Sequence, residues 1–215
     1  MGRCPRPVIA IVTAVLLAAC STRPAPVTPN GAAAASPPSG WAYLLWTDPR
    51  WEAALPADWT AGDPTATTAP EGSLEPIQQA NLDFANRMAT SGATHFLAYG
   101  SIGGQQGGGL YVFVESGDAS LDAFVERELE LDRTLVGPAT VIDRTTVVLA
   151  EGVATRLTYV GTIGDWPPFS ENDYLFRLAD GRSLTIAISG GDPASDPAAL
   201  ASFAGQVITT LRPVP

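Results

Sequence analysis

The sequence predicts an α+β fold in which an antiparallel β-sheet is flanked by helices, as in an α/β/α sandwich. Short segments rich in β-branched and aromatic residues run through much of the chain, and turn signals such as Asp180-Gly181 join neighbouring segments. Stretches with helical spacing of apolar residues occur near the beginning, middle and end of this region. With 215 residues and 46% hydrophobic content, the chain can form one domain of ordinary size with a core.

The N-terminal segment 1–19 is expected to be a signal peptide. Arg3 and Arg6 precede an apolar run over 8–19, which is shorter than the ~20 residues of a membrane-spanning helix. The run ends in Leu17-Ala18-Ala19-Cys20, which resembles the lipobox of bacterial lipoproteins. That resemblance implies cleavage before Cys20 and attachment of acyl chains, such as palmitate, to this residue.

Lipidation of Cys20 would place the protein in the cell envelope. Acyl chains contribute ~0.8 kcal/mol per buried methylene, so two or three of them would hold it on the extracytoplasmic face of the cell membrane. Ser21 would permit sorting to the outer membrane in a host with two membranes. The alternative is a secretory signal without lipidation, in which Cys20 follows the cleavage site by coincidence.

The segment after Cys20 is expected to be a tether, and the domain to occupy 41–213. Residues 21–40 contain five prolines and, apart from Val27, no large aliphatic side chain, so 20–40 is expected to be disordered. The formal net charge is −10, from 12 basic and 22 acidic residues, and none of the basic residues is lysine. Such a charge opposes binding to nucleic acid and to anionic head groups, so the membrane partnership is expected to come from lipid alone.

The first part of the domain combines strands with a helix. The segments 41–46 and 51–55 are expected to be strands around a turn at Asp48-Pro49, followed by a corner at Pro56–Trp59. A helix is predicted over 75–88. Strands are predicted over 96–101 and 110–115, with the glycine-rich Gly103–Gly109 as a mobile hairpin loop between them.

The second part has the clearest pattern. A second helix should begin after Asp118 or Ser120, with a buried stripe formed by Leu121, Phe124, Val125 and Leu129. Strands are expected over 141–143, 146–149, 154–163, 173–178 and 182–189. Both positions of Asp180-Gly181 favour positive φ, which suits a tight hairpin turn. A last helix should be capped by Asp196, begin at Pro197 and carry an apolar stripe from Leu200 to Leu211.

The order of these elements resembles the PsbP-like domain, which extrinsic subunits of photosystem II, Mog-type factors that bind the Ran GTPase and mycobacterial Lpq-type lipoproteins share. The matching residues are Leu55–Trp59, Glu151–Arg156, the Tyr174–Ser189 hairpin and the end of the last helix at Leu211-Arg212-Pro213. The resemblance implies a non-enzymatic module that binds other proteins or small ligands. It carries over no functional residue, because the family has no common catalytic set.

Two aromatic side chains are candidate ligand-binding residues. Trp166 and Phe169 flank two prolines in a connection between predicted strands. They either fold back onto the core or form an exposed platform for a peptide, a lipid or a sugar ring.

A hydrolase of envelope glycans or esters is the catalytic alternative. Its nucleophile and base would be Ser101 and His95, which is the only histidine of the chain, or a pair of carboxylates. Because Tyr99 replaces the first glycine of a nucleophile elbow, we expect no catalytic site.

No metal or cofactor is expected. The sequence lacks the several cysteines and histidines of a zinc site, and Glu171 with Asn172 and Asp173, or Asp192 with Asp196, lacks the spacing of a calcium loop. The sequence therefore predicts a lipid-anchored extracytoplasmic binding module for an envelope protein or small ligand, with an envelope hydrolase or a carbohydrate-binding module as alternatives.

Overall fold

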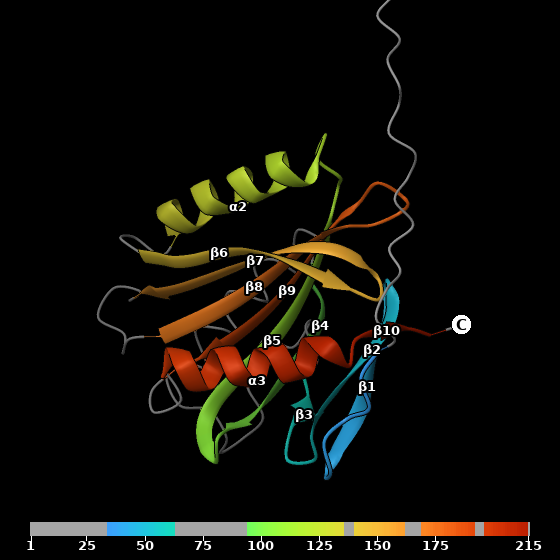
Figure 1. Ribbon diagram of the computed structural model, residues 1–215, viewed down its shortest axis with the longest axis vertical. Coiled ribbons are helices and arrows are strands. Elements are labelled where there is room, and N and C mark those ends of the chain that lie inside the picture. The colour runs from blue at the N-terminus through green and yellow to red at the C-terminus, as the bar shows by residue number, and fades with distance from the viewer. Residues whose placement is uncertain (1–33, 63–93, 136–139, 162–168, 192–195, 215) are drawn as a thin grey trace, which may run out of the picture.

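The computed structural model describes residues 34–62, 94–135, 140–161, 169–191 and 196–214 (Figure 1). The elements are β1 (Trp41–Thr47), β2 (Arg50–Pro56), β3 (Thr60–Ala61), β4 (Thr94–Ile102), β5 (Gln105–Glu115), α2 (Leu121–Leu135), β6 (Thr140–Leu149), β7 (Gly152–Gly161), β8 (Phe169–Arg177), β9 (Ser183–Gly190), α3 (Pro197–Thr209) and β10 (Arg212–Pro213). The signal-peptide segment, Cys20 and the helix expected over 75–88 lie outside the described residues.

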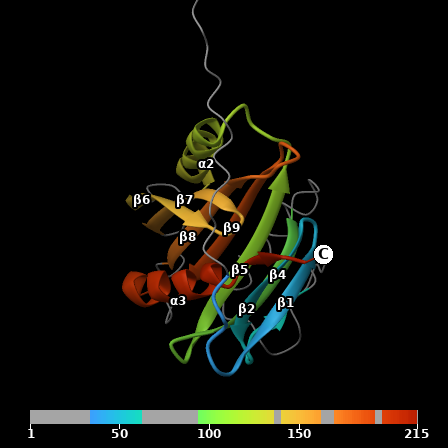
Figure 2. The same cartoon turned by 45° about the vertical axis from the view of Figure 1, so that its right-hand side comes forward.

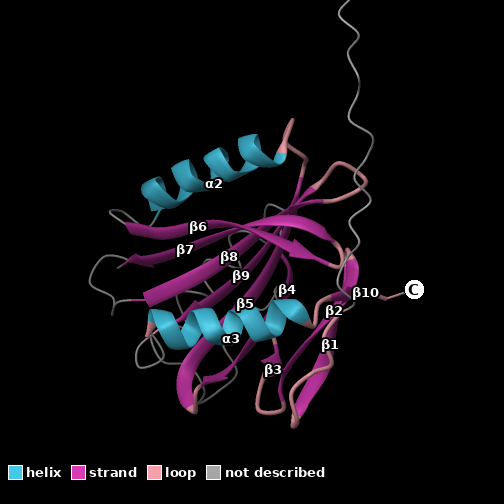
Figure 3. Ribbon diagram, in the orientation of Figure 1, coloured by secondary structure: helices cyan, strands magenta, loops and turns pink. Residues whose placement is uncertain are grey.

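Among the described residues the fold is a seven-stranded antiparallel sheet with one helix on each face. Its strand order is β3-β4-β5-β9-β8-β7-β6, and β1, β2 and β10 form a separate small sheet. Helix α2 covers one face and α3 the other (Figures 1 and 3). Figure 2 shows the β1–β2 hairpin beside β4, at the end of the large sheet away from β6. The predicted α+β class and flanked antiparallel sheet are confirmed.

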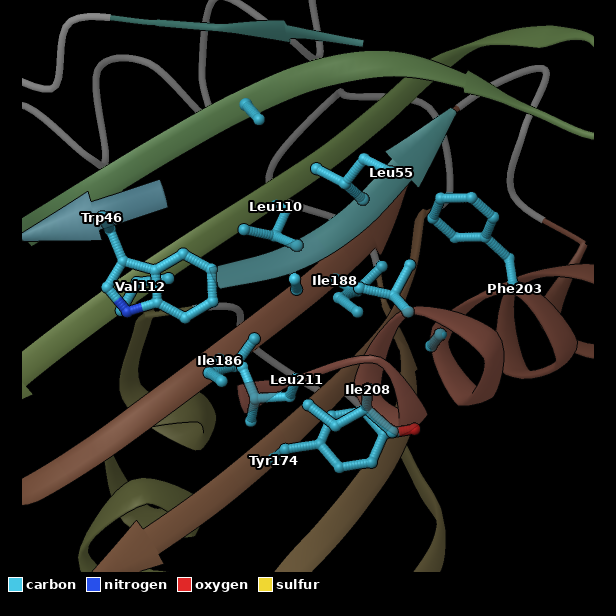
Figure 4. Close-up of a cluster of buried hydrophobic side chains, with 14 of the residues drawn as sticks. Trp46, Leu55, Leu110, Val112, Tyr174, Ile186, Ile188, Phe203, Ile208 and Leu211 are labelled. Atoms are coloured by element: carbon cyan, nitrogen blue, oxygen red, sulfur yellow. The ribbon is translucent and has the colours of Figure 1, made fainter. Parts of the chain in front are cut away.

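The larger core lies between the sheet and α3 (Figure 4). Helix α3 begins as predicted, since the Asp196 carboxylate accepts the Ala198 N–H at 3.0 Å and Pro197 occupies the first turn. Leu200, Phe203, Val207 and Ile208 are buried against Leu110, Val112, Ile186 and Ile188 of the central strands. The helix ends at Thr209, so Leu211 is buried beyond it, and Arg212-Pro213 pair with β2 instead of ending the helix.

The smaller core lies beneath α2. Phe124, Val125 and Leu129 pack on Leu157, Tyr159, Phe169 and Leu175 of β7 and β8, which confirms the predicted stripe. The helix starts where the sequence indicated, because the Ser120 hydroxyl accepts the Ala123 N–H at 3.1 Å.

Several strand boundaries differ from the prediction. β6 is one strand over Thr140–Leu149 with a register shift between Val141 and Asp143, so the two short strands expected there are one. β7 ends at Gly161, and β8 begins at Phe169, four residues before the expected start. Pairing with a neighbour on both sides extends β8 through polar residues that have no strand pattern of their own.

The glycine-rich segment is not a loop. Only Gly103 and Gly104 form the turn, with φ of +61° and +81°, while Gly107–Gly109 belong to β5 and are buried. A Cβ on Gly108 would lie 2.9 Å from Trp59, so this strand lacks side chains where the indole ring passes over it. The prediction of a mobile loop over 103–109 is therefore wrong.

The turn between β8 and β9 also differs in type. Gly181 has φ +90°, but no non-glycine residue that the structure describes has positive φ, so Asp180 does not. The Gly181 N–H donates to the Leu178 carbonyl at 3.0 Å and the Leu178 N–H to the Arg182 carbonyl at 2.9 Å. These bonds define a three-residue connection in which only the last residue needs the left-handed region.

Part of the segment that was expected to be a tether lies on the domain. The Ala35 N–H donates to the carbonyl of Thr209 at 2.8 Å, and thereby satisfies one of the free carbonyls at the end of α3. The Trp41 N–H donates to the Pro38 carbonyl at 3.2 Å, so residues 34–40 lie on the domain. The disorder predicted over 20–40 is therefore wrong for residues 34–40, and residues 20–33 lie outside the described residues.

Candidate functional site

The candidate site is a groove next to the Pro56–Trp59 corner, where the ring of Trp59 stacks on the lining residue Phe203. The Pro56–Trp59 corner is closed by a hydrogen bond from the Trp59 N–H to the Pro56 carbonyl at 3.0 Å. This turn directs the ring against β4, where its Nε1 donates to the Ser101 carbonyl at 2.9 Å. A Cβ on Gly100 would lie 2.2 Å from the ring, so glycine is required there.

Phe203 of α3 joins two tryptophans in one aromatic group. Its ring stacks on Trp59 with centroids 5.3 Å apart and an interplanar angle of 20°. The ring centroid of Trp41 lies 5.5 Å from that of Phe203, and the two rings are tilted by 47°. Trp59 and Phe203 are buried while Trp41 is half-buried, so part of the Trp41 ring remains accessible to solvent.

The groove has a volume of about 500 Å³ and opens to solvent between α3, the β4–β5 turn and the corner after β2. Its lining is mixed in character. It consists of Trp41, Pro56, Asp58, Ser101, Ile102, Gly103, Gly104, Ala199, Ser202, Phe203 and Gln206. Small-ligand sites in proteins typically combine apolar side chains with a few hydrogen-bonding groups, as this lining does.

The polar side chains of the groove suit binding better than acid–base chemistry. Asp58 and Gln206 are exposed, and the Ser101 hydroxyl accepts from Gln106 Nε2 at 2.9 Å. Asp58 is the one titratable side chain in the described lining. General acid–base catalysis needs a positioned donor and acceptor, and this lining supplies a single carboxylate.

The sequence-predicted pair Ser101 and His95 is not brought together. Both belong to β4, six residues apart, which at the rise of a strand separates their backbones by roughly 20 Å. Ser101 lies in the groove, whereas the position of His95 is near the other end of the strand. A nucleophile and base must lie within hydrogen-bonding reach, so this pair does not form a hydrolytic site.

Phe169 is not part of an exposed platform. It is the first residue of β8, is 5% exposed, and packs edge-on against Tyr159 with centroids 6.4 Å apart. Its burial in the α2 core removes it from the candidate ligand-binding residues. Trp166 lies outside the described residues.

Glu171, Asn172 and Asp173, which lack the spacing of a calcium loop, are consecutive residues of β8. Alternation along β8 places Asn172 and Asp173 on opposite faces of the sheet. Asn172 accepts from the Thr158 hydroxyl at 2.7 Å, and Asp173 accepts from Tyr159 at 3.0 Å. Asp192 lies outside the described residues. In the ranges that the structure describes, no group of three or more His, Cys, Asp or Glu side chains is placed to hold a metal ion.

No helix in the described part of the chain is long and apolar enough to cross a membrane.

The residues that line the groove could be predicted only in part from the sequence. The cluster of tryptophans near residue 41 was a signal, but Phe203 follows 162 positions later and looks like an ordinary core residue of α3.

Comparisons with known proteins identify the fold. No protein-family model and no curated protein matches the sequence. Cyanobacterial PsbP from Synechocystis sp. is similar in structure, with a TM-score of 0.50 and 14% identity over 86% of this chain and 99% of that chain. A protein of Bacteroides thetaiotaomicron has a TM-score of 0.40 and 15% identity, over 77% of this chain and 45% of its own.

A protein of unknown function from Pseudomonas aeruginosa, described as a putative regulator, has a TM-score of 0.43 and 12% identity, over 81% of this chain and 98% of its own. At 14% identity the likeness to cyanobacterial PsbP concerns the fold alone. The chain therefore has an α+β fold similar to that of cyanobacterial PsbP.

Proposed function

We propose that this protein is a lipid-anchored, non-enzymatic binding module on the extracytoplasmic face of a bacterial membrane, and that the groove at Trp41 and Phe203 holds its ligand. The anchor rests on the lipobox-like Leu17-Ala18-Ala19-Cys20 and the acyl chains that it implies on Cys20. The binding role rests on the groove, which combines aromatic rings with hydrogen-bonding side chains on rigid elements.

The anchoring geometry follows from where the chain leaves the domain. Ala35 is fixed to the end of α3, so the segment from Cys20 to Ala34 can place the domain at most roughly 50 Å above the membrane. The net charge of −10 repels anionic head groups, which favours a domain held off the surface to which it is tied. The resemblance to Lpq-type lipoproteins agrees with this arrangement, in a host with one membrane or two.

The ligand that suits the groove best is a small molecule, or the exposed tip of an envelope protein, with one flat apolar face and polar edges. The half-buried ring of Trp41 offers a stacking surface, and Asp58, Ser202 and Gln206 lie where they can accept or donate hydrogen bonds. One carboxylate among neutral groups favours a neutral or cationic ligand over an anion.

A carbohydrate is the second candidate ligand, and a specific observation favours it. Sugar rings have an apolar face and a hydroxyl-rich rim, which correspond to the aromatic and polar sides of this groove. Binding of envelope glycan fragments should therefore be lost with Trp41→Ala and retained with Trp166→Ala, provided that both variants keep the fold. If only Trp166→Ala abolished binding, the binding site would instead be assigned to the connection between β7 and β8.

The absence of catalysis is tested separately. Hydrolysis of generic glycan and ester substrates should be undetectable, and it should be equally undetectable with His95→Ala and Ser101→Ala. A turnover that both changes abolish would replace this proposal with the hydrolase alternative.

A further inference from the structure

The carboxylate of Asp58 and the ring of Trp41 belong to the same rim of the groove. Trp41 of β1 is paired with Pro56 of β2, and the Ala57 N–H donates to the Gly40 carbonyl at 3.1 Å. These two contacts hold the residue before Asp58 beside the residue before Trp41. Both side chains line the groove, so one ligand can contact both.

Two aromatic rings bound the groove next to this carboxylate. Trp41 and Phe203 both line it, and their planes are tilted by 47° with centroids 5.5 Å apart. The wall of the groove therefore contains two aromatic surfaces of different orientation. The face of an aromatic ring carries partial negative charge and attracts a cation, and tryptophan does so most strongly.

The formal charge of the lining is negative. Asp58 is exposed, and no basic side chain belongs to the lining. No ion pair between residues that the structure describes involves Asp58. The net charge of −10 on the whole chain adds a negative potential around the groove. A cationic group on a ligand is attracted by each of these features, and an anionic group is repelled.

The kind of cation follows from the exposure of the site. A metal ion such as Ca²⁺ takes six to eight oxygen ligands, whereas this lining supplies one carboxylate. A primary ammonium group is strongly hydrated, and a single exposed carboxylate compensates little of the hydration that it would lose. A trimethylammonium group has methyl groups that pack on rings, and aromatic sites characteristically recognise it. The apolar side chains of Pro56 and Ile102 extend the surface on which such methyl groups can pack.

The rest of the groove limits what is attached to this group. Ser202 and Gln206 of α3 supply neutral hydrogen-bonding side chains, which suit a hydroxyl or ether oxygen. The volume of about 500 Å³ lies in the range of small-molecule sites.

We propose that the ligand of the groove carries a trimethylammonium group, which lies against Trp41 with the Asp58 carboxylate beside it. This inference rests on the proposed function, because it takes the same groove as the ligand site. It narrows the ligand from neutral or cationic molecules to quaternary ammonium compounds of the choline type. The group can belong to a free molecule or to the head group of a lipid.

The test is titration calorimetry of the full-length protein in micelles of a polyoxyethylene detergent, which carries neither a sugar nor an ammonium group. The probes are choline, phosphocholine and the carbon isostere of each, in which a tert-butyl group replaces the trimethylammonium group. The cation–π contact and the exposed ion pair each contribute about two- to fivefold in affinity, so the ammonium compound should bind about tenfold more tightly than its isostere. Whichever of choline and phosphocholine binds more tightly identifies a free molecule or a lipid head group as the source.

The ratio of the two affinities, ammonium compound over isostere, is the readout for variants. Asp58→Asn and Trp41→Leu should each lower this ratio about two- to fivefold, whereas a change that only loosens the groove weakens both compounds together. Asp122→Asn is the control, because it removes the same charge from a side chain of α2 that is 91% exposed. Added salt should lower the ratio of the wild type more than that of Asp58→Asn.

The outcomes separate this inference from the proposed function. Equal binding of each compound and its isostere, or binding of neutral sugars alone, would overturn the inference and leave the binding module intact. A wild-type ratio in Asp58→Asn would also overturn it, and this variant decides the question if Trp41→Leu fails to fold. Selective binding of choline that Ser202→Arg leaves unchanged would overturn both, since the ligand would then bind outside the groove.

Discussion

The indole N–H of Trp59 donates a hydrogen bond to the main-chain carbonyl of Ser101 at 2.9 Å, which ties the corner after β2 to the end of β4. The same ring stacks on Phe203, so one side chain links the small sheet, the large sheet and α3. The buried ring of Trp59 therefore supports Phe203, which lines the groove.

Replacement of Gly100 should disturb this ring and destabilise the fold. In Gly100→Ala the new methyl group would lie 2.2 Å from Trp59 Cδ1, and overpacking of this kind costs about 1–3 kcal/mol. Urea denaturation measures the loss. Gly205→Ala is the matched control, since nothing lies within 4 Å of its Cβ and alanine in a helix is favoured by ~0.5–1 kcal/mol. A Gly100→Ala variant as stable as the wild type would show that the ring is not confined as described.

A buried hydroxyl joins the end of α3 to β2. Thr210 Oγ1 accepts the Ala54 N–H at 2.8 Å and donates to the Val207 carbonyl at 2.7 Å. Thr210→Val keeps the shape but leaves the Ala54 N–H without an acceptor, which should lower the free energy of unfolding by about 1–3 kcal/mol. Thr210→Ser keeps the hydroxyl, so its free energy of unfolding should fall by less than that of Thr210→Val. Equal losses in the two variants would assign the effect to packing instead of the hydrogen bond.

The proposed anchor depends on Cys20 alone. Cys20→Ser should remove the acyl chains, so the variant should lack the mass of a diacylglyceryl group, which intact-protein mass spectrometry of the native product detects. Because the domain begins near residue 34, its thermal unfolding should be unchanged. A native protein whose residue 20 is a free thiol would refute the anchor and leave the description of the groove unaffected.

Features coded by neighbouring residues could be predicted from the sequence. Asp196 and Pro197 mark the start of α3, and the stripe through Phe124 and Leu129 marks the buried side of α2, because both signals lie within one or two turns of helix. Glu128 falls on that stripe as well, so its burial had a signal that an analysis of apolar residues alone overlooks.

Features that depend on distant contacts could not be predicted. Gly107–Gly109 have the composition of a loop, yet they belong to a strand that pairs with β4 and β9, and Trp59 and Tyr111 occupy the space that a Cβ on Gly108 or Gly109 would take. Residues 34–40 have the composition of a linker, yet the free carbonyl of Thr209 holds Ala35. The groove joins Trp41 to Phe203, a pairing that only the tertiary structure creates.

The most direct test of the account is ligand-observed NMR with envelope glycan fragments and other small ring compounds, applied to the wild type and to Ser202→Arg. The exposed Ser202 lines the groove, so an arginine there should fill it without touching the core, and Ala198→Arg adds the same side chain on α3 outside the lining. The account predicts that at least one compound binds the wild type and Ala198→Arg alike and loses tenfold or more in affinity, about 1.4 kcal/mol, with Ser202→Arg. Binding that Ser202→Arg leaves unchanged, or no binding by the wild type, would contradict it.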